Sequence, residues 1–114
     1  MIMEESNNTL ENVPNGKFKV KELVDYQEGG IVSRTLVDRE SGTLTVFAFD
    51  KEQSLSEHSA PYDAFVQVLD GTGSIIIDGK EHELQEGETI VMPADIPHAV
   101  QAPEKFKMFL IMIR

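Results

Sequence analysis

The pair Asp78-Gly79 lies between two strand-like runs, SIII and KEHEL, and constrains the fold more than any other feature of the sequence. An Asp-Gly pair suits a two-residue type I′ turn, because both central residues of that turn need a positive φ. From Phe18 onward the apolar residues alternate or form short runs, and no segment has the i, i+3, i+4 spacing of an amphipathic helix. The sequence therefore predicts an all-β domain built from hairpins.

Other segments extend this pattern along the chain. The runs GIVSRTLV and TLTVFAF flank DRESG, which predicts a second hairpin with glycine at its turn. The final run, FKMFLIMI, is apolar on both faces toward its end, as in a strand that is covered on both sides. About eight to ten short strands with almost no helix indicate a β-sandwich or barrel.

The length of 114 residues is enough for one hydrophobic core but not for two. Residues 1–16 are rich in Asn and Glu and end in Pro-Asn-Gly, so we expect a mobile arm there and a single domain over residues 17–114. The start of the chain has no signal-peptide pattern, and the longest apolar run, Phe109 to Ile113, is too short to span a bilayer. We therefore expect a cytoplasmic location.

The charge balance and the lack of cysteine exclude several functions. A net charge of -10 argues against nucleic acid and against an anionic membrane surface, since both must be met by clustered Lys and Arg. Without cysteine there are no disulfides, no thiolate catalysis and no Cys-ligated zinc. The remaining candidates for chemistry are three histidines, the carboxylates and two tyrosines.

Two of the histidines stand at the ends of loops. His58 comes shortly before AFVQVL, and His98 opens a short strand-like run after Pro93 and Pro97 have stiffened the approach. If the sheet brings these two strand starts together, the two imidazoles share one cavity. Alternatively, each histidine caps or packs at a strand end, which is the commoner role of an isolated histidine.

The middle of the chain resembles the first of two sequence motifs of the cupin superfamily, small jelly-roll barrels with a metal or ligand site inside. That motif reads Gly, five residues, His-x-His, three or four residues, Glu, six residues, Gly. It runs here from Glu52 to Gly71. Its two histidines fall on His58 and Ala60, and its glutamate falls on Ala64.

The second cupin motif reads Gly, five residues, Pro-x-Gly, two residues, His, three residues, Asn. It falls on Gly87, Pro93, Asp95, His98 and Ala102. The resemblance implies a cupin jelly-roll β-barrel, also called a double-stranded β-helix.

The resemblance also implies an incomplete metal site. Of the four residues with which cupins typically bind a metal, this chain has His58 and His98, with alanine at both other positions. A catalytic divalent metal normally has about three protein ligands plus water, so we expect a weak site for Zn, Fe, Mn, Ni or Cu, or no metal. Asp63 is a candidate third ligand, because strand alternation is relaxed in its loop. His82 is a weaker candidate, since a solvent-facing histidine in KEHE is the simpler interpretation.

The two alanines leave space beside the histidines. Strand alternation puts two valines on the same face as Ala64. Met92, Met108 and Met112 are typical gap-filling core residues. We expect a small apolar pocket, and its candidate lining residues are Ala60, Ala64, Val66, Val68 and Met92.

Two functions stay open at this point. In the first, His58 and His98, with Asp63 or solvent, hold a divalent metal or act as acid and base on a small organic substrate; cupins with complete ligand sets carry out oxygenation, isomerisation or lyase reactions. In the second, the barrel is a metal-free module that binds or senses a small ligand without catalysis. Burying two imidazoles costs more free energy than burying apolar side chains in the same place. A site without a use would not need them, which favours a functional site of either kind.

We also expect a homodimer. The N-terminal arm and an edge strand of such a barrel present unpaired backbone groups and apolar side chains, which a second copy can cover.

Overall fold

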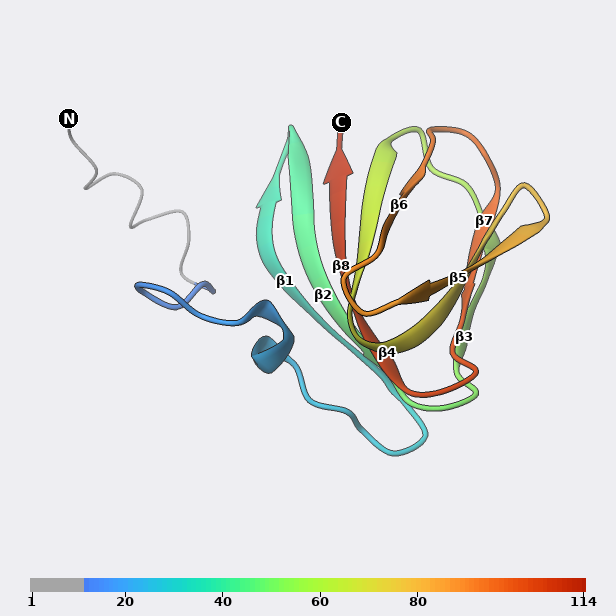
Figure 1. Ribbon diagram of the computed structural model, residues 1–114. Helices are drawn as coiled ribbons and strands as arrows, with labels where there is room; N and C mark the ends of the chain where they lie inside the picture. The colour runs from blue at the N-terminus through green and yellow to red at the C-terminus, as the bar shows by residue number, and fades with distance from the viewer. Residues whose placement is uncertain (1–11) are drawn as a thin grey trace.

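The computed structural model describes residues 12–114, which form eight antiparallel strands in one curled sheet (Figure 1). A short 3-10 turn, η2 (Val20–Leu23), precedes them. The all-β prediction is thereby confirmed. The strands are β1 (Ile31–Arg39), β2 (Gly42–Phe49), β3 (Ser54–His58), β4 (Asp63–Ile77), β5 (Lys80–Gln85), β6 (Thr89–Met92), β7 (His98–Gln101) and β8 (Phe106–Ile113).

Hydrogen bonding places the strands in the order β1-β2-β8-β4-β7-β3, with β5 and β6 also paired to β4. The first half of the long strand β4 pairs with β6 and β8, and its second half pairs with β5 and β7. Because β4 belongs to both halves of the sheet, its bend closes the curl seen in Figure 1.

The bend in β4 depends on Gly71 and Gly73. The register with β8 shifts between Val68 and Asp70, and Gly71 follows with φ +75°. A Cβ atom at Gly71 would overlap the backbone of Lys105, and one at Gly73 would overlap the ring of Phe106. The G-x-G pair is therefore structural, because it lets β4 bend closely around the start of β8.

Both predicted hairpins are present. Asp78 and Gly79 have φ of 53° and 79° between β4 and β5, as a type I′ turn requires. The DRESG segment turns β1 into β2, where Arg39 pairs with Gly42.

The main core fills the inside of the curl. Its aromatic centre is a stack of Phe49 on Phe106, with ring centroids 4.8 Å apart and planes inclined by 4°. Buried residues of β4, β5, β6, β7 and β8 surround this stack, as strand alternation predicts.

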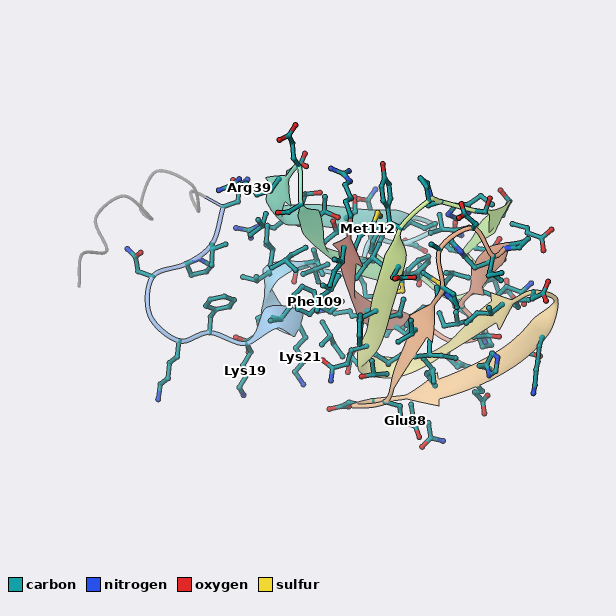
Figure 2. The ribbon with its side chains drawn as sticks, turned by 90° about the horizontal axis from the view of Figure 1, so that it is seen from above. Lys19, Lys21, Arg39, Glu88, Phe109 and Met112 are labelled. Carbon is teal, nitrogen blue, oxygen red and sulfur yellow. The ribbon has the colours of Figure 1, made fainter. Side chains whose placement is uncertain are left out.

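A second apolar cluster lies outside the curl, where the segment before β1 packs on the sheet (Figure 1). Figure 2 shows Phe109 of β8 on the side of this segment. The Tyr26 hydroxyl donates a 2.6 Å hydrogen bond to Asp70, and Lys107 Nζ donates to the Lys21 carbonyl at 2.7 Å. The second face of β8 is thus partly covered by the chain itself, while Ile113 stays 53% exposed.

The expected mobile arm covers residues 1–16, and most of it lies outside the described residues. Val13, in the part that is described, packs against the outer cluster. Between residues 12 and 114, no helix is both long and apolar enough to cross a membrane.

Candidate functional site

The pairing of β3 with β7 brings His58 and His98 together. His58 is the last residue of β3, His98 is the first of β7, and the two are Cα partners. Their Nε2 atoms are 3.2 Å apart, with ring centroids separated by 4.4 Å and ring planes inclined by 72°. The two imidazoles expected to share a site are therefore in direct contact through their Nε2 atoms.

The ring tautomers follow from the other nitrogen of each histidine. His58 Nδ1 is 2.8 Å from the Ser56 carbonyl oxygen, and His98 Nδ1 is 3.1 Å from that of Ile96. A carbonyl can only accept, so we assign the proton of each neutral ring to Nδ1. Both Nε2 atoms then carry free lone pairs 3.2 Å from each other, and two adjacent acceptors of this kind suit a cation between them.

The two rings differ in burial. His98 is 8% exposed, whereas His58 is exposed at the end of its strand. Burial lowers the pKa of His98 below its usual value, the neighbouring His58 lowers it further, and the Ile96 carbonyl partly opposes both effects. Burial thus favours the neutral form of His98, whose Nε2 carries a lone pair.

A cavity of about 130 Å³ opens beside the pair. Ala60, Ala64 and Met92 line it, as expected from the sequence. Val66 and Val68 point inward, as strand alternation predicts, but are completely buried in the main core and are not among the lining residues. Met108 belongs to the buried core, as predicted, and it also lines the cavity. The lining residues that the sequence does not predict are Phe47, Leu55, Tyr62, Val100, Leu110 and Met112.

Asp63 has a different role from the one considered for it. Its Oδ1 accepts a 2.9 Å hydrogen bond from the Ala94 backbone N–H. Nearby, the Ala60 carbonyl accepts from the Asp95 N–H at 2.7 Å. These two bonds tie the β3–β4 loop and the first residue of β4 to the β6–β7 loop, and Figure 1 shows both loops at the same end of the barrel.

His82 does not join the pair either. It is the Cα partner of Ile75 in the β4–β5 hairpin, and it is not among the residues that line the cavity. Within residues 12–114, no group of three or more His, Cys, Asp or Glu side chains is placed to hold a metal ion. The structure therefore brings together His58 and His98, but neither proposed third ligand.

A larger hollow, of about 370 Å³, lies elsewhere on the barrel. Its buried polar group, the Ser74 hydroxyl, donates a 2.6 Å hydrogen bond to Glu81 and so already has a partner. This hollow contains no histidine, and we therefore take the cavity beside the His58–His98 pair as the candidate site. The lining residues of the larger hollow, which is not the candidate site, are Glu52, Gln53, Ser54, Ser74, Glu81, Gln101, Ala102 and Pro103.

The backbone also matches the two sequence motifs. Glu52 and Asp95 occupy motif positions where cupins have glycine, and they have φ of 71° and 67°. Residues other than glycine rarely adopt this conformation, so both motif positions have a backbone that favours glycine although neither residue is glycine. A family model described as "Cupin domain" matches residues 45–114. The chain belongs to the cupin family.

Solved structures agree with this assignment. This cupin has a TM-score of 0.88 and 40% identity to a conserved protein of unknown function from Streptococcus pyogenes, over 93% of this chain and 94% of the other. A cupin 2 conserved barrel domain protein from Leptotrichia buccalis is 48% identical with a TM-score of 0.83, over 85% of this chain and 47% of the other, so the chain spans about half of that protein. A cupin superfamily protein from Desulfitobacterium hafniense is 25% identical with a TM-score of 0.86, over 91% and 96% of the two chains. The sequence matches no curated protein.

Proposed function

We propose that this cupin binds a small organic molecule in the cavity beside His58 and His98, and that the two imidazoles hold a weakly bound metal ion there. The observation that carries the proposal is the 3.2 Å separation of two Nε2 atoms that both carry free lone pairs. Two imidazole nitrogens on one tetrahedral metal ion, each about 2.0–2.1 Å from it, are about 3.3 Å apart. The separation of the two nitrogen atoms thus fits a metal ion.

The fit covers only part of a usual ligand set. Ala60 and Ala64 have no donor atoms, so two histidines would hold the ion and the other positions would be open to water or to the organic molecule. A bound metal would supply Lewis-acid polarisation of that molecule. The chain itself would orient the two imidazoles through the Ser56 and Ile96 carbonyls and shield the site with apolar walls.

The cavity limits the kind of molecule that it can take. A volume of about 130 Å³ is comparable to cavities of about 150 Å³ that hold benzene. Apart from the two histidines and Tyr62, the lining is apolar. A sugar would leave several hydroxyls unpaired, at about 1–3 kcal/mol each. We therefore infer a compact, largely apolar molecule with one polar group that meets the imidazoles.

A metal-free binding or sensing module is the alternative. This alternative is supported by the position of Asp63, which does not join the histidine pair as a third ligand and instead accepts a hydrogen bond from the Ala94 N–H. In that case the two imidazoles would orient the polar group of the ligand by hydrogen bonding alone.

Metal analysis of protein purified without a nickel column tests the proposal. We expect a bound transition metal that is lost in His58→Ala and in His98→Ala but kept in the matched control His82→Ala, which removes an imidazole outside the cavity. If the wild-type protein carries no metal, and neither metal ions nor a chelator shift its melting temperature, the metal-associated function is wrong and the metal-free module is favoured.

We further propose that two copies pair through the outer face of the sheet. Phe65 and Val91 are Cα partners across β4 and β6, and they stay 41% and 42% exposed. Phe65 also pairs with Ile111 of β8, and Ile113 is exposed near the end of the same strand. The same apolar row on a second copy offers a self-complementary surface for a two-fold dimer.

A further inference from the structure

The position of the missing carboxylate ligand has unusual neighbours. Ala64 stands where the cupin motif has glutamate, and it is the Cα partner of Met92 on β6 and of Met112 on β8. The three residues form one row across three strands. The place of an oxygen ligand is therefore flanked on both sides by thioether side chains.

All of these side chains share one cavity. Met92 and Met112 line it together with His58 and His98, and Met108 lines it as well. Met112 and Phe109, both labelled in Figure 2, lie on opposite faces of β8, and Phe109 packs in the outer cluster while Met112 lines the cavity. A methionine side chain has three rotatable bonds, so its sulfur can reach a site beside a neighbouring alanine.

The lack of negative charge in the cavity favours a monovalent ion over a divalent one. Among its lining residues, all of which belong to the described part of the chain, there is no carboxylate. A divalent ion held by two neutral imidazoles would keep both charges beside apolar walls. Because the cost of burying an ion rises with the square of its charge, a monovalent ion costs roughly four-fold less to place there.

The donor atoms point to the same ion. Thioether sulfur is a soft ligand that selects Cu(I), whereas carboxylate oxygen suits harder ions such as Mn and Mg. We propose that the cavity is a copper(I) site, in which the Nε2 atoms of His58 and His98 and the sulfur of Met92 or Met112 bind the ion. This inference rests on the proposed metal association of the histidine pair and goes beyond it by naming the ion and its sulfur ligand.

Competition titration of metal-free protein tests this inference. Cu(I) is titrated without oxygen against a chromogenic Cu(I) chelator, and Zn(II) is titrated against a zinc indicator. We expect tighter binding of Cu(I) than of Zn(II), and we expect Met92→Leu combined with Met112→Leu to lower the Cu(I) affinity roughly 10- to 100-fold without changing that for Zn(II). Met-to-Leu exchange conserves volume, so the fold is kept, and the melting temperature of the metal-free variant checks this.

The matched control is Leu110→Met. It adds a thioether to the same cavity wall without removing a proposed ligand, so the Cu(I) affinity should not fall. X-ray absorption at the copper edge supplies a readout that does not depend on affinity. We expect a sulfur shell beside the nitrogen shell in the wild type and its loss in the double Met-to-Leu variant.

The possible failures are distinguishable. One outcome is copper bound by nitrogen alone, with the same Cu(I) affinity in the wild type and in the double Met-to-Leu variant. That result overturns the thioether site but leaves a metal at the histidine pair. Tighter binding of Zn(II) than of Cu(I) also overturns this inference alone. Absence of binding for every ion tested overturns both this inference and the proposed metal association.

Discussion

His58 and His98 are in contact because they are Cα partners across β3 and β7, although forty positions separate them in the sequence. The pairing is irregular between Leu55 and His58, so the strand slips just before it presents its histidine. The 3.2 Å contact between the two Nε2 atoms therefore depends on the register of two short strands and on the loops that hold them.

The first prediction concerns pH. The pKa of His98 is lower in the folded protein than in the unfolded chain, mainly because the ring is buried. As the pH falls through about 6.5, the unfolded chain takes up a proton more readily than the folded protein, so stability is lost on the acid side. Urea unfolding of metal-free protein between pH 8 and 5 should show this loss, with a shallower dependence in His98→Gln. An equal slope in the two proteins would contradict the assignment to His98.

The second prediction concerns the bend in β4. Gly73→Ala places a Cβ atom against the ring of Phe106, and overpacking of this kind costs about 1–3 kcal/mol. Gly30→Ala is the matched control, since its nearest non-adjacent atom would lie 3.8 Å away. Chemical denaturation should therefore show a large loss for Gly73→Ala and almost none for Gly30→Ala.

The third prediction concerns the loops at the site. Asp63→Ala removes the acceptor for the Ala94 N–H, which should cost about 0.5–1.5 kcal/mol of unfolding free energy. Asp63→Asn keeps an acceptor oxygen and should recover most of this loss. If Asp63 were instead a metal ligand, the metal content would fall in both variants, and their unfolding free energies would be similar.

The fourth prediction restores the family ligands. Ala60→His combined with Ala64→Glu places two donor groups on the wall of the cavity that holds the histidine pair. The affinity for divalent metals should rise by orders of magnitude, because the site then has a full ligand set and a compensating charge. Isothermal titration with Mn(II) or Zn(II) measures the change, and no gain would mean that the two alanines are not the ligand positions.

The fifth prediction concerns the outer face. Phe65→Lys puts a charge into the exposed apolar row, and it should convert a dimer into a monomer in sedimentation velocity. Ser56→Lys alters an exposed residue of β3 and serves as the control. A wild-type protein that sediments as a monomer at every concentration would remove the dimer proposal.

Local chemistry explains what could be predicted from the sequence. The Asp78-Gly79 turn requires two positive φ angles, and local apolar patterns identify AFVQVL, SIII and the final run as strands without any knowledge of their partners. These patterns do not show that AFVQVL and SIII belong to one strand, β4, because Gly71 and Gly73 between them are typical of a turn. The histidine pair could also be predicted, because the motif spacing of His58 and His98 is a property of the chain alone.

The remainder of the site depends on pairings between distant segments. Phe47 reaches the cavity because it is the Cα partner of Met108, and this requires β8 to lie beside β2. Val66 and Val68 have the predicted direction but lie deeper in the barrel than the cavity, and alternation gives no information on depth. The role of Asp63 depends on a hydrogen bond to a loop thirty-one positions away.

The place of β8 between β2 and β4 also bears on the order in which the protein can be assembled. The β1–β2 hairpin is synthesised early, yet it has no hydrogen-bonding partner in the sheet until residues 106–113 have been made. At about 5–20 residues per second, the ribosome needs several seconds to reach them. During that time β2 has an unpaired edge and apolar side chains. The nascent chain is therefore prone to aggregation until its last strand, β8, pairs with β2.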